Sequence, residues 1–441
     1  MHGRSDSTAA FRRSLCSVPK RGQGGCAFRG AKLALQPIAD ALHLVHGTIV
    51  CQGHSWQSRP TASSGPTLHR ISFSSALSDL DVTLGAEARL SRCLDELTAK
   101  YNPPAIFVYA TCVPSMSGDD IRAVCKAASL RLRRPVLAVD APGFLGDKQD
   151  GVDIAAKVLL EDVIGTSEPE VTTATDIVLI GENNVAAEAV EIKALLARCG
   201  IRVLASIPGD GRFAEIAGAH RGRAAILHCS QSLAYLGPAL QVRYGIPYVG
   251  VSFYGAAHTS AALRSIAALL ITRGAPVALA SQVDAVIDAN EAAVAAQLQA
   301  LLPRLRGKRV LLLTGGVKSW SLADTVQRFG MQLAGVSSQK CSEVDRQQLD
   351  AVIAGACPIF DGMDADELDE RLASGDVDLV LGGSFSRFAV QRRCIPWLEV
   401  NHERRIALTG YVGTVALARA MTEVLECPVL EFLRAERGLS E

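Results

Sequence analysis

The sequence predicts an α/β protein made of three doubly wound domains, each built around a parallel sheet. Short runs of apolar and β-branched residues alternate with helical stretches of about 10–15 residues, which is typical of βαβ units. This alternation begins afresh near residues 176 and 309, each time after a polar or helical linker. A chain of 441 residues also exceeds what one ordinary hydrophobic core accommodates, so several domains are expected.

The linkers at residues 166–175 and 284–308 set the predicted boundaries. We expect a flexible tail and three α/β domains, at residues 1–24, 25–165, 166–300 and 301–441. Apolar, β-branched runs predict strands at residues 105–109, 135–139, 176–180, 202–205, 224–227, 310–314, 332–335, 377–381 and 397–400. Longer segments between them predict helices at residues 119–133, 186–199, 233–244 and 321–329. Ligands of such folds bind beyond the carboxyl ends of the strands, so we expect one central cleft between the domains.

The composition argues against several classes of partner. Lys plus Arg and Asp plus Glu both number 45, so the net charge is zero and neither nucleic acid nor an anionic membrane surface is indicated. No run of about 18 consecutive apolar residues predicts a transmembrane helix. Residues 1–24 also lack the apolar core of a signal peptide. We therefore expect a cytoplasmic protein, in which thiols stay reduced.

Three cysteines in the first quarter of the chain carry the most specific signal. Cys26, Cys51 and Cys112 each lie in or beside a turn that contains glycine or proline, and the last two directly follow apolar, strand-like runs. Three thiolates so far apart in sequence predict an iron–sulfur cluster where their loops converge. A cubane cluster normally takes four cysteine ligands, so we expect another chain to supply what is missing.

The other cysteines do not form Cys-x-x-Cys pairs, which disfavours a zinc ribbon. Most of them lie in helix-like or strand-like segments and are interpreted as small buried hydrophobic residues. These are Cys93, Cys125, Cys199, Cys341, Cys357, Cys394 and Cys427. Cys16 lies in the tail and is given no role.

A second candidate site combines Cys229 and His402. Each follows a predicted strand, at residues 224–227 and 397–400. Taken alone, Cys229 reads as a structural thiol and His402 as a helix-cap or salt-bridge histidine. Because both strands are expected to end at the same cleft, the two side chains could together hold a preformed metal cluster by its two ends.

Further polar residues suit an anionic ligand. The loop Gly315-Gly316-Val317-Lys318 offers backbone amides and a lysine, but it is not the P-loop pattern, and nucleotide binding is not expected. His54, Arg59 and Lys148 are additional candidates, since a guanidinium such as that of Arg59 stabilises anionic groups.

Ten short segments together resemble the nitrogenase component-1 family over essentially the whole chain after the tail. The segments are residues 24–32, 46–51, 55–56, 63–68, 108–113, 118–126, 140–144, 252–255, 314–320 and 401–404. As a set they are highly specific for the family and less specific for the member. The pattern is most similar to that of the family's NifE-type scaffold subunits.

The resemblance implies pairing with a homologous β-type subunit, NifK-like or NifN-like, in an (αβ)2 heterotetramer. Cys26, Cys51 and Cys112 match the family's ligands to an interface Fe–S cluster, of the 4Fe–4S type or a P-cluster-like eight-iron type, and the partner would supply the remaining ligands. Cys229 matches the cysteine that holds one end of a large nitrogenase-type iron–sulfur cofactor or its precursor. A separate ATP-dependent iron protein, NifH-like, would deliver electrons, which fits the absence of a P-loop.

Departures from the family pattern indicate which member of the family this chain resembles. Dinitrogenases have a histidine ligand where Asn401 stands and a second histidine at or near Val152, so dinitrogen reduction is not expected. NifE-type scaffolds share the asparagine, but they usually read Asn-Gln-Glu-Arg followed by Pro-Tyr-Ala-Gly-Tyr, and they carry a longer cysteine-bearing N-terminal extension. This chain reads Asn401-His402-Glu403-Arg404. His402 would restore imidazole ligation, which suits a catalyst that holds its cofactor tightly.

The first reading is therefore a catalytic D-type subunit of a nitrogenase-like reductase, similar to methylthio-alkane reductases. Electrons would reach a cofactor on Cys229 and His402, where C–S bonds of small methylthio compounds are cleaved, while Arg59, Lys148 and Lys318 stabilise the anionic cofactor or its organic ligand. The alternative is a NifE-like scaffold on which the nitrogenase cofactor (FeMo-co) matures. Tetrapyrrole reduction by a related branch of the family is a weaker third option. Those enzymes bind an organic substrate in the cofactor cavity, whereas this chain keeps the cofactor cysteine, Cys229.

Overall fold

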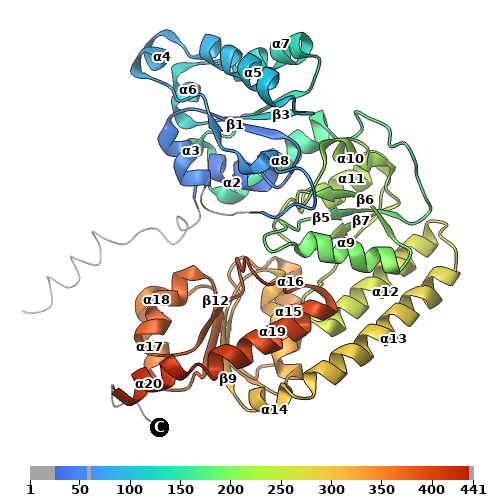
Figure 1. The fold of residues 1–441 in the computed structure, drawn as a ribbon, viewed down its shortest axis with the longest axis vertical. Helices are drawn as coiled ribbons and strands as arrows, with labels where there is room; N and C mark the ends of the chain where they lie inside the picture. Colours follow the sequence, from blue (N-terminus) through green and yellow to red (C-terminus); the bar gives the residue numbers. More distant parts are fainter. Residues whose placement is uncertain (1–24, 57–60, 437–441) are drawn as a thin grey trace, which may run out of the picture.

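The computed structural model describes residues 25–56 and 61–436, which form three parallel sheets surrounded by helices (Figure 1). The predicted fold class is confirmed. The sheets take their strands from residues 42–139, 176–250 and 309–399, and we call the surrounding parts of the chain the first, second and third regions. The predicted domain boundaries stay a prediction, and the predicted tail, residues 1–24, lies outside the described residues.

The first region alternates helices with four strands. Its elements are α2 (Ala27–Leu35), β1 (Leu42–His46), α3 (Ile49–Trp56), η1 (Leu68–Arg70), β2 (Phe73–Ser74), α4 (Asp79–Leu84), α5 (Glu87–Tyr101), β3 (Ile106–Ala110), α6 (Cys112–Ser117), α7 (Ile121–Leu132), β4 (Val136–Val139), η2 (Gly143–Leu145) and α8 (Lys148–Asp162). The second region ends in two long helices. Its elements are β5 (Asp176–Ile180), α9 (Glu188–Arg198), β6 (Arg202–Ile207), α10 (Phe213–Ala217), η3 (Ala219–Arg221), β7 (Ala224–Leu227), α11 (Leu236–Tyr244), β8 (Tyr248–Gly250), α12 (Ala256–Thr272) and α13 (Ala278–Leu298).

The third region carries the largest sheet. Its elements are α14 (Leu302–Leu305), β9 (Arg309–Leu313), α15 (Val317–Arg328), β10 (Gln332–Ser337), α16 (Glu343–Ile353), β11 (Ile359–Phe360), α17 (Ala365–Ala373), β12 (Leu379–Gly382), α18 (Ser384–Arg392), β13 (Trp397–Glu399), α19 (Gly410–Leu425) and α20 (Pro428–Glu436). None of the helices in the described ranges combines the length and the apolar character needed to cross a membrane.

Every sheet has a topological switch point. The strand orders are β2-β1-β3-β4, β6-β5-β7-β8 and β11-β10-β9-β12-β13, with parallel pairing throughout. The chain winds outward in both directions from the central pairs β1/β3, β5/β7 and β9/β12. The loops that leave each pair diverge at the carboxyl ends of the strands and leave room there for a ligand.

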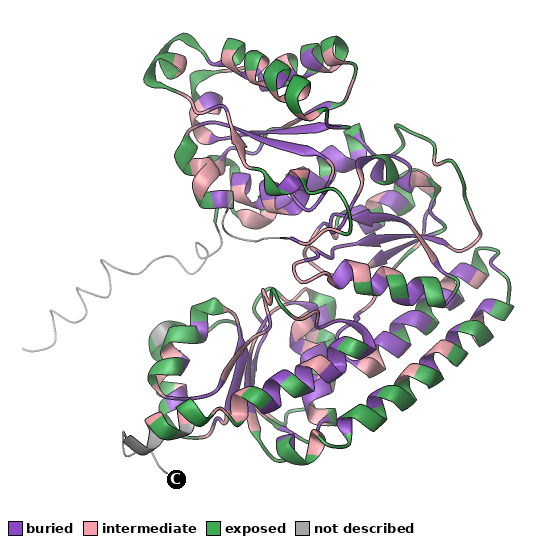
Figure 2. Ribbon diagram, in the orientation of Figure 1, coloured by how far each residue is buried: buried purple, intermediate pink, exposed green. Residues whose placement is uncertain are grey.

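Strand β5 lies between two hydrophobic cores. Ile177 and Leu179 belong to a core that extends into the third sheet, and Val178 and Ile180 belong to one that extends into the first sheet. Since successive side chains of a strand point to opposite faces, one short apolar run contributes to both cores. Figure 2 shows the buried strands inside each region and the exposed surfaces of the outer helices.

Strand β1 was not predicted from the sequence, because two histidines interrupt its apolar run. In the structure both imidazoles are buried and hydrogen-bonded: His43 Nδ1 lies 2.8 Å from the Tyr109 hydroxyl and His46 Nδ1 lies 3.0 Å from Ser75 Oγ. Burial lowers the pKa of His43 to about 3, so the ring is neutral and its place in the sheet costs no buried charge.

Two glycines allow α2 and α8 to pack with their backbones in close contact. A Cβ atom on Gly30 would lie 1.9 Å from the Lys148 carbonyl oxygen, and one on Gly151 would lie 1.9 Å from the Ala27 carbonyl oxygen. Neither oxygen belongs to a side chain that can rotate away. The approach also fixes the beginning of α2, where the Ala27 N–H donates to the Gly146 carbonyl at 3.0 Å.

Replacement of Gly151 by alanine should therefore separate the two helices. We expect Gly151→Ala to lower the free energy of unfolding by about 2 kcal/mol, because the overpacking cost exceeds the gain in helix propensity. Chemical unfolding with urea measures this change. Gly250→Ala is the matched control, since a Cβ there meets nothing within 4 Å. Equal stability of the two variants would contradict the prediction.

Candidate metallocluster sites

Cys112 and Cys51 flank the switch point of the first sheet. Cys112 is the first residue of α6 and lies two residues after the end of β3, close to the strand end that the sequence indicates. Thr111 ties the two strand ends together: its N–H and its hydroxyl both donate to the His46 carbonyl, at 3.2 and 3.0 Å. The Gly47 turn makes this possible, because a Cβ atom on Gly47 would lie only 2.0 Å from Thr111 Oγ1.

The expectation that Cys51 follows a strand is wrong. The strand before it is β1, which ends at His46, and Cys51 lies within α3. Ile49 and Val50 are 65% and 73% exposed, whereas all of β1 is buried. The apolar pair before Cys51 therefore belongs to the surface of a helix.

Cys26 lies at the start of a helix and is positioned by helix packing. It is the N-cap residue of α2, and its backbone forms an antiparallel bridge with Asp147, at the N-cap of α8. The close packing of α2 on α8 thus positions this thiol, and no strand end is involved.

The structure brings the three predicted thiols together. A Cβ atom on Gly143 would lie 3.0 Å from Cys112 Sγ and 3.2 Å from Cys26 Sγ, and the Gly143 N–H donates to Cys112 Sγ at 3.2 Å. Burial raises the pKa of Cys51, and the neighbouring Cys112 and Cys26 thiols raise it further. All three cysteines are free. Convergence of soft sulfur donors on a bare glycine fits an iron–sulfur group, and Gly143 leaves space where a side chain would intrude.

The described residues contain no group of three or more His, Cys, Asp or Glu side chains arranged to hold a single metal ion. The three thiols are therefore not a preformed mononuclear site.

Cys229 lies at the switch point of the second sheet, two residues after β7. A Cβ atom on Gly181, which follows β5, would lie 3.0 Å from Cys229 Cβ. Burial raises the pKa of the Cys229 thiol, with further contributions from the carboxylates of Glu182 and Asp345, while backbone N–H groups at 231 and 232 oppose the shift. The Ser232 N–H donates to Cys229 Sγ at 3.4 Å.

The N-terminal end of α8 connects the two thiol sites. Asp147 bridges Cys26, and two residues later Gln149 Nε2 donates to the carbonyl of Gln231, in the turn after Cys229, at 3.2 Å. Lys148, predicted near the cofactor, lies between these two contacts in the chain. A single helix terminus therefore sets the spacing between the two sites.

A buried acid–base cluster lies beside Cys229 and was missed from the sequence. His228 Nε2 lies 3.1 Å from Glu182 Oε2, and the ring packs 5.0 Å from that of Tyr254. The pKa of the Glu182 carboxyl is lowered. Burial by itself would raise this pKa, but His228, the hydrogen bond from the Asn184 N–H and the charge of Lys318 together outweigh burial. The only signal in the sequence is that His228 adjoins Cys229 and that Glu182 follows the glycine after β5.

Lys318 lies where the second and third regions meet. Its Nζ donates to the Val400 carbonyl at 2.7 Å and lies 4.8 Å from the centre of the Tyr254 ring. Lys318 also helps to lower the pKa of the Glu182 carboxyl and opposes part of the rise in the pKa of Glu188. A role of Lys318 beside the cofactor stays a prediction.

Asn401 and His402 follow β13 in one turn, which Glu399 organises. Glu399 Oε1 accepts the N–H groups of Asn401 and His402 at 2.9 and 3.0 Å. Asn401 Nδ2 donates to the Leu313 carbonyl at 3.2 Å and would lie 2.8 Å from a Cβ atom on Gly383. The Asn401 side chain therefore bridges the carboxyl ends of β9 and β12. The assignment of His402 as a ligand stays a prediction.

The remaining predicted residues lie on the first region. His54 is exposed on α3, three residues after Cys51, and its Nε2 lies 3.5 Å from Arg29 Nη1. This contact is with α2, the helix whose N-cap residue is Cys26. A role of His54 beside the cofactor stays a prediction. Arg59 lies outside the described residues.

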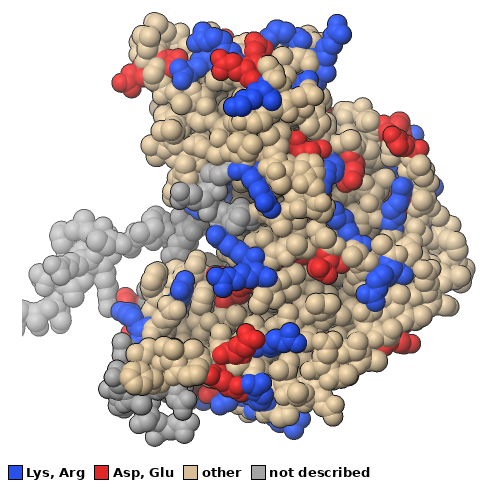
Figure 3. All heavy atoms as spheres, viewed as in Figure 1, with Lys and Arg blue, Asp and Glu red and all other residues tan. Residues whose placement is uncertain are grey.

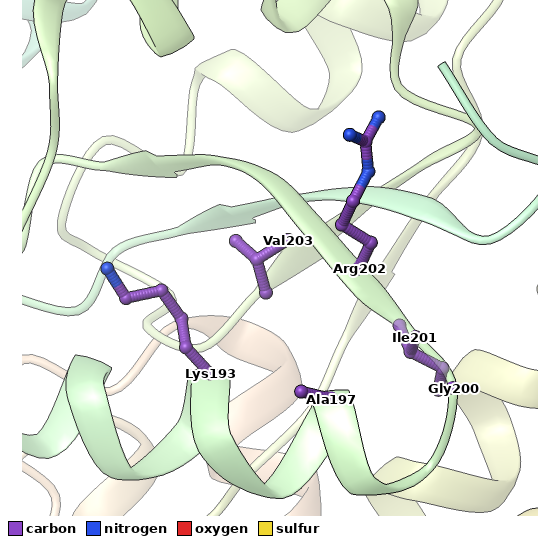
Figure 4. Close-up of a pocket in the computed structure, with 6 residues that line it drawn as sticks. All are labelled: Lys193, Ala197, Gly200, Ile201, Arg202 and Val203. Carbon is purple, nitrogen blue, oxygen red and sulfur yellow. The ribbon is translucent and has the colours of Figure 1, made fainter. Parts of the chain in front are cut away.

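The hollow in Figure 4 lies elsewhere, between α9 and the start of β6. It is lined by Lys193, Ala197, Gly200, Ile201, Arg202 and Val203. Its two cations are engaged, Lys193 with Asp210 and Arg202 with Asp176 at 2.6 Å. Because Arg202 begins β6, the hollow lies at the amino end of the second sheet, opposite the loops that carry the candidate sites.

The buried Glu188 makes stability depend on pH. Burial, followed by the Glu182 carboxylate, raises the pKa of Glu188 from 4.5 to about 7. The folded chain then keeps a proton between pH 4.5 and 7 that the unfolded chain has lost, so the free energy of unfolding falls as pH rises across this window. We expect Glu188→Gln to remove the slope and to raise stability at pH 8 by up to about 3 kcal/mol.

Urea unfolding at pH 5, 6, 7 and 8 tests this dependence. Glu191→Gln, on the exposed face of the same helix, is the control and should keep the wild-type slope. The same slope in Glu188→Gln as in wild type would show that Glu188 does not retain the proton.

Comparisons with known proteins bear on the family of the whole chain. Residues 26–426 match a family model described as nitrogenase component 1 type oxidoreductase. The chain is 45% identical over 428 residues to the nitrogenase iron-molybdenum cofactor biosynthesis protein NifE of Bradyrhizobium diazoefficiens, covering 96% of this chain and 78% of that protein. It is 42% identical over 429 residues to the protein of the same name from Klebsiella pneumoniae, covering 95% and 93%.

A solved structure, nitrogenase Cp1 at pH 5, superposes with a TM-score of 0.85 at 23% identity and covers 94% of this chain and 91% of that one. At this identity the likeness supports the fold alone. The family match and the identities above decide the classification: the chain belongs to the nitrogenase component 1 type oxidoreductases.

Proposed function

We propose that this chain is a scaffold subunit on which an iron–sulfur cofactor precursor is held, matured and passed on. Cys229 and the turn at Asn401–His402 would hold the cargo, and Cys26, Cys51 and Cys112 would hold an interface cluster shared with a partner. The observation that carries the proposal is that the thiols of Cys26 and Cys112 meet at Gly143, close enough to Cys51 to raise its pKa, in a chain 45% identical to a cofactor biosynthesis protein.

The surface around the three thiols supports a partner subunit. Large apolar side chains are exposed immediately beside Cys51, Cys112 and Gly143. They are Ile49, Val50, Met116, Phe144 and Leu145, each more than half exposed. An exposed apolar patch of this kind is typical of a subunit interface. A homologous β-type subunit with thiols of its own would cover the patch and complete the ligand set, in the (αβ)2 arrangement expected for the family.

The Asn401 contacts favour a scaffold over a reductase. The asparagine amide is used within the fold, on the Leu313 carbonyl, and offers weaker ligation than the imidazole of a catalytic subunit. A cargo held firmly at one end, by Cys229, suits release. The reductase reading rests on departures from the usual scaffold pattern, chiefly His402, and the cofactor biosynthesis proteins compared above give C–S cleavage no support.

Basic residues at the cleft would attract an anionic cargo. Lys318 lies at the meeting point of the second and third regions, and Lys and Arg side chains gather on the face of Figure 3 where the first region approaches the third. The chain would take electrons from a separate ATP-dependent iron protein, since it has no phosphate-binding motif of its own.

Loss of one interface thiol should remove the interface cluster. We expect Cys112→Ala, co-expressed with the β-type partner, to lose most of the cluster signal in electron paramagnetic resonance and the matching iron content. Cys93→Ala, another half-buried thiol of the first region, is the control and should match wild type. A full signal in Cys112→Ala would remove this thiol from the ligand set.

Cargo transfer distinguishes the scaffold from the reductase. We expect the anaerobically purified wild-type complex to activate cofactor-free dinitrogenase, and Cys229→Ala to reduce this activation at least tenfold. The interface signal should persist in Cys229→Ala. Release of a small thiol from a methylthio-alkane, with iron protein, ATP and reductant, and no activation of dinitrogenase, would instead establish the reductase.

A further inference from the structure

We propose that Cys341 is a second thiol ligand for the cargo, placed opposite Cys229 on the third sheet; the inference rests on the proposed scaffold function. The sequence prediction counted Cys341 among the buried residues of regular segments, and this is wrong. Cys341 is half-buried and lies in the turn between β10 and α16, at the carboxyl edge of the third sheet.

The contacts of Cys341 lead directly to the Cys229 segment. Cys341 Sγ donates to the Gly316 carbonyl at 3.8 Å. A Cβ atom on Gly316 would lie 3.5 Å from the hydroxyl of Ser230, the residue after Cys229. One turn of backbone, at Gly316, therefore separates the two thiol-bearing loops.

Asp345 lies between the same two loops. It accepts a hydrogen bond from Ser230 Oγ on the second region, and from Trp320 Nε1 at 3.0 Å on the third. Its carboxylate affects both thiols. Burial is the main reason why the pKa of Cys341 and that of Cys229 are raised, and the negative charge of Asp345 raises both further. In Figure 1, α16, which carries Asp345, lies at the edge of the third region that faces the second.

A second observation points to a ligand at this seam. His228, the residue before Cys229, is 2% exposed, and its Nδ1 has no hydrogen-bond partner among the residues that the structure describes. Lys318 supplies a cation on the same side, next to Tyr254. Two thiols from different sheets and an imidazole with one unpartnered nitrogen offer donors to an iron–sulfur group, and the lysine offers a counter-charge for its negative charge.

The step is a ligand exchange without oxidation or reduction. The Cys341 thiol releases its proton to water, its sulfur donates an electron pair to an iron of the cargo, and a water or a thiolate of the delivering protein leaves that iron. Thiols from two sheets would then hold the cargo across the Ser230–Asp345 contact, so separation of the two regions would loosen it.

The test compares iron retention in the purified complex of this chain with its partner. Wild type, Cys341→Ser, Cys341→Ala and Cys229→Ala are challenged anaerobically with a ferrous-iron chelator, and the interface cluster is followed separately by electron paramagnetic resonance. We expect both Cys341 variants to lose cargo iron about tenfold faster than wild type, with the interface signal unchanged. Cys357→Ser, a half-buried thiol at the amino end of β11, is the matched control and should behave as wild type.

Each other outcome overturns the inference in a distinguishable way. If Cys229→Ala loses its cargo iron but Cys341→Ser retains it as wild type does, the scaffold stands and Cys341 is not a ligand. If serine restores the wild-type rate and alanine does not, Cys341 only supports the Gly316 loop through its hydrogen bond. If Cys229→Ala retains as much iron as wild type, the proposed cargo site itself is wrong, and the inference fails with it.

Discussion

The burial of β5 on both of its faces is the constraint on which the rest of the molecule depends. Alternate side chains of this strand enter different cores, one shared with the first sheet and one with the third. Burial of each such side chain contributes about 1.5–3 kcal/mol, so both contacts resist separation. The second region thereby fixes the position of its neighbours, and with them the distance between Cys229 and the residues that approach it from either side.

Much of the fold followed from the sequence, because parallel sheets with both faces covered produce continuous apolar runs. The strands at residues 176–180 and 224–227 were predicted with the bounds that the structure has for β5 and β7. Strand β1 was not predicted because His43 and His46 interrupt its apolar run. Their burial is stabilised by hydrogen bonds to Tyr109 and Ser75. Such partners come from distant parts of the chain and leave no local signal.

The residues of the candidate sites were likewise predictable only where the sequence carries a local signal. Cys112 and Cys229 stand just after strands, and position in the chain was enough to single them out. Cys26 depends on a contact between two helices, which the sequence marks only by Gly30 and Gly151. Cys341 was misjudged because its turn has neither glycine nor proline, so nothing local separates it from a buried residue of a strand.

The two cores that meet at β5 close at different times during synthesis. The core on the side of Val178 and Ile180 contains no residue beyond Ile246, whereas the core on the side of Ile177 and Leu179 extends to Met421. At elongation rates of about 5–20 residues per second, the interval between them is on the order of ten seconds. During this interval the face of β5 that carries Ile177 and Leu179 is covered by α9 and α12 of its own region, whereas the sides of α12 and α13 that pack on α15 and α19 are still uncovered. A chaperone that binds apolar surface would find its target on these two helices while the third region is being made.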